Sequence, residues 1–66
     1  MPTAAETLGA RLKARRLNRG LTVDRLADLL GVTRATVYRW ESGEVAVPIP
    51  RWDDIANVLG DTWSVS

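Results

Sequence analysis

Residues 23–42, VDRLADLLGVTRATVYRWES, constrain the fold of this chain more than any other segment. Their apolar side chains fall into two short runs at helical spacing, Leu26, Ala27 and Leu30 and then Val32, Val37 and Trp40. Gly31, between the runs, can adopt the positive φ of a tight turn at little steric cost. Ala27 is small enough to let two helices cross closely. The spacing of Ala27, Gly31 and Val37 therefore predicts two helices joined by a tight turn, the helix-turn-helix layout.

This layout usually places its second helix in the major groove of DNA. The distribution of charge agrees with such a partner. Residues 1–19 carry a net charge of +4, residues 20–43 are balanced, and residues 44–66 carry −3. We therefore expect the basic front end to meet a phosphate backbone and the acidic back end to face away from it.

Composition excludes several other classes of protein. The 66 residues include no cysteine and no histidine, so we expect no metal site and no cofactor. No apolar run approaches the roughly 18 residues of a membrane span, and the first ten residues lack the features of a signal peptide. We expect a cytoplasmic protein whose residues 1–66 form one domain, with no membrane partner. A chain of this size has little room for a substrate pocket, so neither an enzyme nor a small-molecule ligand is expected.

Capping residues and glycines divide the chain into elements. The expected helices cover about residues 4–18, 23–30, 34–41 and 50–59. Thr3 and Glu6 are spaced as a capping box, and Thr22 and Thr33 are expected to cap the second and third helices. The side chains expected to face the core are Leu8, Leu12 and Leu17 on the first helix and Ile49, Trp52, Ile55, Ala56 and Leu59 on the fourth. Residues 61–66 are either one last helical turn or a frayed tail.

Residues 8 to about 63 resemble the Xre/Cro/C1-type helix-turn-helix domain of bacterial regulators and lambdoid phage repressors. The resemblance rests on LGARLKARRLNRGLT, LADLLGVTRATVYRWESG and IANVLG. It implies an all-α fold, a compact four- to five-helix bundle with a central helix-turn-helix, as in the lambda repressor-like DNA-binding fold. It also implies double-stranded DNA as the partner and transcription regulation as the function.

Two positions depart from the family's pattern. Many members have Gln where this chain has Val23, and that Gln side chain touches a phosphate; only the backbone N–H of Val23 can do so here. The loop after Gly43 is rich in Lys and Arg in many relatives but reads EVAV in this chain. We therefore expect no phosphate contact from this loop.

The expected third helix offers five side chains that its apolar stripe does not need, and we predict that they read bases: Thr33, Arg34, Ala35, Tyr38 and Arg39. Arg34 lies near the end of the helix that enters the groove, and its planar fork suits guanine O6 and N7. Ala35 could meet a thymine methyl group, and Arg39 could reach a base edge or a phosphate.

Other polar residues receive supporting roles. The residues predicted to contact phosphate are Arg11, Arg15, Thr22, Val23, Thr36 and Ser42. Arg16 stands at the position that resembles the family's internal ion-pair partner, and Glu41 follows Trp40. The resemblance implies that Arg16 and Glu41 bond to each other, largely buried, and tie the first helix to the third.

One short recognition helix reads few base pairs, so we expect a homodimer on DNA that reads a pseudo-palindromic operator, as a repressor does. The apolar candidates for its interface are Val45, Val47, Ile49, Trp63 and Val65, although Trp63 could instead pack in the core. Two alternatives remain open. One is an excisionase-like winged-helix factor, for which TVYRWESGEVAVPIPRW could supply a helix and a β-wing. The other is a helix-turn-helix protein-interaction module, such as an antitoxin component.

Overall fold

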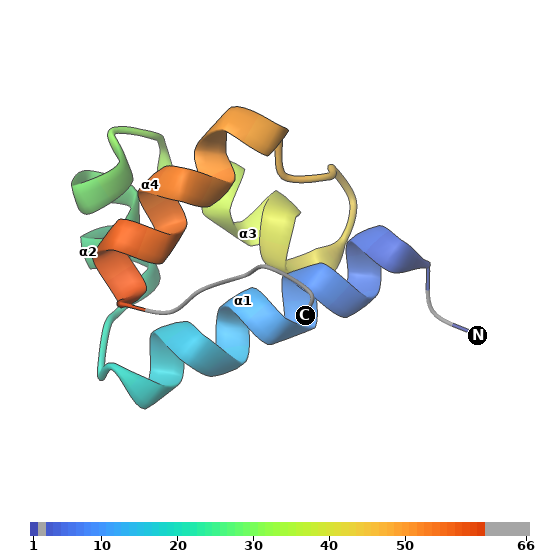
Figure 1. Cartoon of the computed structure of the whole chain (residues 1–66), viewed down its shortest axis with the longest axis horizontal. Helices are drawn as coiled ribbons and strands as arrows, with labels where there is room; N and C mark the ends of the chain where they lie inside the picture. The colour runs from blue at the N-terminus through green and yellow to red at the C-terminus, as the bar shows by residue number, and fades with distance from the viewer. Residues whose placement is uncertain (2, 61–66) are drawn as a thin grey trace.

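The computed structural model describes residues 1 and 3–60, which form four helices. These helices are α1 (Ala4–Asn18), α2 (Val23–Leu30), α3 (Arg34–Ser42) and α4 (Ile49–Leu59). Figure 1 shows α1 along one edge, with α4 crossing in front of α3. No strand occurs in the described part of the chain, so the predicted all-α class is confirmed. The last helical turn considered for residues 61–66 lies outside the described residues, as do Trp63 and Val65.

Local capping explains where the first three helices begin. Thr3 Oγ1 accepts a hydrogen bond from the Glu6 backbone N–H at 3.1 Å, and Glu6 Oε1 accepts one from the Thr3 N–H at 2.9 Å. This is the predicted capping box. Thr22 Oγ1 accepts from the Arg25 N–H in the same manner, and Thr33 caps α3. Each hydroxyl satisfies a backbone donor that the helix itself leaves without a partner.

The turn between α2 and α3 has the predicted geometry. Gly31 adopts φ 70° and ψ 31°, the left-handed conformation that favours glycine. The Val32 N–H donates to the Ala27 carbonyl at 3.0 Å and so closes the end of α2. Ala27 is buried and belongs to the core cluster to which both helices contribute.

The core forms where side chains from all four helices meet. Its fully buried members are Leu12, Leu26, Val37, Ile55 and Leu59, with Val23, Ala27, Leu30 and Trp40 beside them. Arg51 of α4 donates from Nη1 to the Leu30 carbonyl at 3.1 Å, which ties α4 to the end of α2. None of the described helices is both long and apolar enough to cross a membrane.

Two expected core residues are instead exposed, and two helix ends differ by one residue. Leu17 is 57% exposed because the inward stripe of α1 continues through Leu12 to Arg16. Ile49 is 82% exposed because it begins α4, one residue earlier than predicted, before that helix reaches the core. Helix α3 extends one residue further than predicted, to Ser42.

Helices α1 and α3 approach closely at Gly9, a residue that the sequence analysis did not single out. Gly9 is buried, and a Cβ atom built there would overlap the Trp40 carbonyl oxygen and lie 2.7 Å from that of Glu41. Only glycine fits this backbone contact without a shift. The contact holds the end of α3 against α1 and thereby sets the position of α3 relative to α1.

Candidate nucleic-acid interface

Helix α3 has two chemically distinct sides. Val37 and Trp40 are buried in the core. At 3.6 residues per turn, the exposed positions gather on the opposite side, and they are Arg34, Ala35, Tyr38, Arg39 and Ser42. We call these five residues the outward face of α3. It includes four of the five predicted base-reading residues, while the fifth, Thr33, is exposed at the N-cap of the same helix.

Several hydroxyls that were predicted to meet DNA already hold the helix ends. Thr33 Oγ1 accepts from the Thr36 N–H at 3.3 Å and lies 2.9 Å from the Thr36 hydroxyl oxygen. Ser42 Oγ donates to the Arg39 carbonyl at 3.1 Å and accepts from the Glu44 N–H at 3.3 Å. A hydroxyl has one O–H donor and two acceptor lone pairs, so the lone pair that Ser42 retains can only accept a further hydrogen bond. To donate to a phosphate oxygen, Ser42 would have to give up its bond to the Arg39 carbonyl. In the free protein, these hydroxyls therefore serve to fix the two ends of α3.

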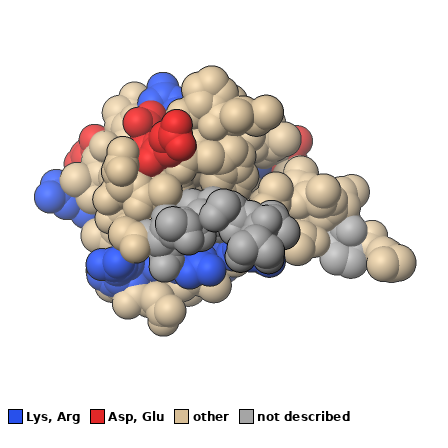
Figure 2. Space-filling model, viewed as in Figure 1, with Lys and Arg blue, Asp and Glu red and all other residues tan. Residues whose placement is uncertain are grey.

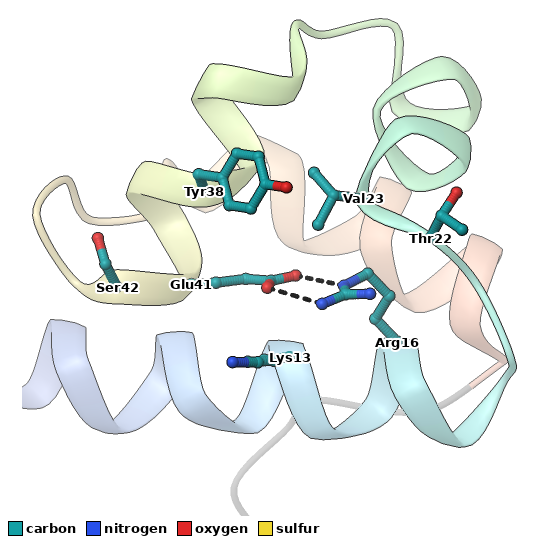
Figure 3. A pocket seen from close by; sticks show the side chains of 7 residues that line it. All are labelled: Lys13, Arg16, Thr22, Val23, Tyr38, Glu41 and Ser42. Atoms are coloured by element: carbon teal, nitrogen blue, oxygen red, sulfur yellow. Dashed lines mark hydrogen bonds and ion pairs between the residues drawn. The ribbon is translucent and has the colours of Figure 1, made fainter.

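A hollow adjoins the outward face, between α1, the start of α2 and the end of α3. Its lining residues are Lys13, Arg16, Thr22, Val23, Tyr38, Glu41 and Ser42. Figure 3 shows Tyr38 reaching from α3 toward Val23, with the side chain of Lys13 on α1 across from them. The hollow brings together three residues predicted to contact phosphate, namely Thr22, Val23 and Ser42.

The structure limits Val23 to its backbone and adds Lys13 to the residues that line the hollow. The Val23 side chain belongs to the core and is 8% exposed, so only its backbone is available at the start of α2. Lys13 is exposed and lines the hollow, although the sequence analysis did not select it. Its spacing of three residues from Arg16 places both on the same side of α1, and this signal could have identified it.

The Arg16–Glu41 pair forms one wall of the hollow. Arg16 Nε donates to Glu41 Oε2 at 2.7 Å and Nη2 donates to Oε1 at 3.1 Å (Figure 3). Arg16 Nη1 also donates to the Leu21 carbonyl at 2.8 Å. The two side chains are only 8% and 6% exposed. The hydrogen bonds to Glu41 raise the pKa of the Arg16 guanidinium, although burial opposes this effect. The pair thus joins α1 to α3, as the family resemblance implied, and neutralises the Glu41 charge beside the hollow.

A second arginine–carboxylate pair lies at the exposed end of α3. Arg34 Nε is 3.5 Å from Asp24 Oδ1, and the two side chains are 67% and 65% exposed. Asp24 belongs to the first turn of α2. The pair therefore links the starts of the two helices in the motif, and nothing in the sequence analysis anticipated it.

Charge divides between two regions of the surface. Figure 2 shows Lys and Arg side chains along the edge that α1 forms and an acidic group over α4, with further Lys and Arg side chains above that acidic group and at the left of the view. Arg11 is exposed on α1 and Arg15 is half-buried there, but neither lines the hollow. Asp53 and Asp54 of α4 are exposed. A polyanion would therefore be attracted to α1 and repelled from α4.

The sequence pattern of a family described as a helix-turn-helix domain matches residues 7–61. The chain belongs to this family. The match begins in the first half of α1 and covers both helices of the motif, the turn at Gly31 and all of α4. It therefore includes the outward face and the hollow in full.

Similar proteins place this domain in longer chains. A protein of Pyrobaculum aerophilum, provisionally named an HTH-type transcriptional regulatory protein, is 43% identical over 53 residues. The match covers 80% of this chain but 21% of that protein, so this chain spans about a fifth of the relative's length.

Two solved structures share the fold closely. The clp gene regulator ClgR from Corynebacterium glutamicum is 27% identical, with a TM-score of 0.89, over 94% of this chain and 80% of its own. Fe(II)-HppE, crystallised with the alternative substrate (S)-1-HPP, is 36% identical, with a TM-score of 0.84, over 94% of this chain and 32% of its own. The same fold thus occurs in a gene regulator and as about a third of a substrate-binding chain.

Proposed function

We propose that this helix-turn-helix domain binds double-stranded DNA in a sequence-specific manner and serves a transcription regulator. The observation that carries the proposal is the outward face of α3, which exposes Arg34 and Arg39 while Val37 and Trp40 anchor the opposite side. Family membership and the similarity to two named regulators support the same function. A helix attached in this way can enter the major groove without disturbing the core.

Each part of the interface has a role in this proposal. Arg34 bonds to guanine O6 and N7, and the other base-reading residues are Thr33, Ala35, Tyr38 and Arg39. The hollow beside α3 receives a backbone phosphate, which meets the Lys13 ammonium and the free N–H groups at the start of α2. The remaining phosphate contacts come from Arg11, Arg15, Thr22, Thr36 and Ser42.

The finer proposal is an Xre/Cro/C1-type repressor that binds a pseudo-palindromic operator as a homodimer. Val45 and Ile49 support it, because both apolar side chains are exposed near the start of α4. Val47 is a weaker interface candidate, since it is half-buried and packs against the core. The acidic residues of α4 agree with a surface that faces away from phosphate.

The excisionase-like factor and the protein-interaction module remain as alternative functions with different support. The excisionase-like interpretation needs a β-wing, and residues 43–48 contain no strand. The fold alone does not separate DNA binding from the protein-interaction module, because a similar fold also belongs to HppE, a chain crystallised with a substrate. DNA binding is favoured over this module because the outward face carries two arginines and no carboxylate.

Selection from a random pool of duplexes tests the proposal. We expect enrichment of a near-palindromic sequence, and analytical ultracentrifugation with the enriched duplex should give two copies of the protein per duplex. One copy on an asymmetric sequence would contradict the homodimer but retain DNA recognition. No enrichment at low salt would contradict sequence-specific binding and favour the protein-interaction module.

A further inference from the structure

The exposed pair between Asp24 and Arg34 joins α2 to the residue best placed to read a base. Asp24 Oδ1 lies 3.5 Å from Arg34 Nε. Arginine presents five N–H donors, of which Nε carries one and the two terminal nitrogens carry four. A carboxylate facing Nε leaves the terminal edge of the guanidinium available. That edge can donate two parallel hydrogen bonds to guanine O6 and N7.

The pair also limits the freedom of a long side chain. An arginine that is immobilised on binding loses rotamer entropy, and this loss weakens the contact. Asp24 is on the first turn of α2, whose start is fixed by the Thr22 cap, so its carboxylate offers a stable anchor. Arg34 held there is partly ordered before DNA arrives. Its orientation then favours one mode of contact over the many that a free side chain could adopt.

The negative charge of Asp24 has a second effect on partner choice. A carboxylate near the interface repels phosphate and compensates the charge of Arg34, so it weakens binding to any duplex regardless of sequence. A base contact that uses both terminal nitrogens is retained. A protein discriminates better between two DNA sequences when it is repelled by the incorrect sequence as well as attracted to the correct one.

We propose that Asp24 is a positioning residue that directs Arg34 to guanine and away from phosphate. The inference rests on the proposed function, because it concerns how the outward face of α3 selects its DNA. A simpler explanation is that Asp24 only stabilises α2, since acidic residues in a first turn interact favourably with the helix dipole. That explanation predicts no change in base preference when Asp24 is replaced.

The test compares Asp24→Asn with Asp28→Asn. Asp28 is exposed on the same helix and loses the same charge, but it has no ion-pair partner among the described residues. The probes are the duplex enriched from the random pool, its variants at the base pair whose preference Arg34→Ala removes, and a random duplex. Circular dichroism verifies that each variant is folded. We expect Asp24→Asn to lower the preference for guanine by about three- to fivefold, in keeping with an exposed ion pair, and to tighten binding to the random duplex. Asp28→Asn should leave the preference unchanged.

A double variant identifies the residue through which Asp24 acts. If Asp24 acts through Arg34, Asp24→Asn should cause no further loss of preference when Arg34→Ala is already present. An undiminished effect in that background would overturn the inference. So would an Asp24→Asn protein that binds the enriched duplex more tightly with the same preference for guanine, because Asp24 would then weaken binding without selecting a base.

The role of Asp24 and the proposed function can be contradicted separately. A wild-type protein that prefers the enriched duplex, with an unchanged preference in Asp24→Asn, would overturn the role of Asp24 and leave the proposed function standing. A wild-type protein without any sequence preference would overturn both.

Discussion

The Arg16–Glu41 and Arg34–Asp24 pairs combine the same two chemical groups in opposite environments. Arg16 and Glu41 are 8% and 6% exposed and share two hydrogen bonds, the shorter of 2.7 Å. Arg34 and Asp24 are 67% and 65% exposed and approach to 3.5 Å. Burial makes each member of the first pair depend on the other, because water cannot hydrate the remaining buried charge when one member is removed. Exposure leaves the second pair weak and therefore able to exchange its partner for a ligand.

This contrast separates the residues that build the domain from those that remain available. The buried pair adds a bond from Arg16 to the Leu21 carbonyl and so connects α1, the following loop and α3. The exposed pair connects only the first turns of α2 and α3. We expect the effects of substitution to divide in the same way, with stability lost at one pair and recognition at the other.

The largest effect should come from removing one member of the buried pair. Arg16→Met leaves Glu41 without its partner, and we expect the free energy of unfolding to fall by about 3–5 kcal/mol. Replacing both residues by methionine should be far milder, because no uncompensated charge remains. Chemical denaturation followed by circular dichroism measures both, with Arg34→Met as the exposed control. A thermally neutral Glu41→Gln variant would contradict the structural importance of the pair.

The contact at Gly9 should be nearly as sensitive. Helix propensity alone predicts that Gly9→Ala stabilises α1 by about 1 kcal/mol. We expect a net loss of about 1–3 kcal/mol instead, because the new methyl group would overlap the Trp40 carbonyl and force α3 away from α1. Ala10→Gly, at the exposed neighbouring position, should lose about 1 kcal/mol through propensity alone. A Gly9→Ala protein that is more stable than the wild type would show that the helices can separate without cost.

Substitution at the exposed pair should affect binding and spare stability. Arg34→Ala should weaken the enriched duplex by about 1–3 kcal/mol and relax the preference at one base pair. Its free energy of unfolding should stay within about 0.5 kcal/mol of the wild type, since the side chain is exposed. Arg11→Ala is the matched control, because loss of a phosphate contact should weaken all duplexes equally. Equal weakening by Arg34→Ala, measured by fluorescence anisotropy, would contradict its role in base reading.

The smallest effect concerns a third carboxylate, that of Glu6, which is exposed but hydrogen-bonded. The bonds from the Thr3 backbone and side chain lower the pKa of Glu6 below its ordinary value of 4.5. The stabilisation that the Glu6 carboxylate gives to the folded state is therefore fully present above the pKa of Glu6 in the unfolded chain. It is lost as pH falls through the lower pKa of the folded state. Carbon-13 NMR titration should give the depressed pKa, and amide exchange should show α1 fraying at its start in acid. The depression should persist in high salt, because short hydrogen bonds are screened little; a pKa at or above 4.5 would contradict the capping box.

Local interactions explain which parts of the fold could be predicted from sequence. Thr3, Thr22 and Thr33 cap backbone donors within three residues, and Gly31 sets the turn by its own conformation, so each leaves a recognisable pattern. Arg16 and Glu41 are 25 residues apart, and their pairing was expected only through the family resemblance. The outward face followed from helical periodicity once the core residues of α3 were known.

The missed features depend on how the helices pack. Gly9 looks like an ordinary interruption of a helix until α3 is placed against it. Leu17 and Ile49 are apolar, as core residues usually are, but whether their side chains face the core depends on where α1 and α4 meet their neighbours. The Asp24–Arg34 pair arises from a crossing angle and two side-chain conformations. The hydrophobic periodicity of a single segment predicts none of these features.

The two-sided construction of α3 has a consequence for how proteins with this domain diversify. Val37, Trp40 and Glu41 attach the helix from one side, while Arg34, Ala35, Tyr38 and Arg39 project from the other. The four projecting residues can therefore be exchanged as a set without repacking the interior. A lineage built on this scaffold can acquire a new target through a handful of codon changes, each tolerated by folding before it is useful. The residues that preserve the fold and the residues that can change the target are thus separated within one nine-residue helix.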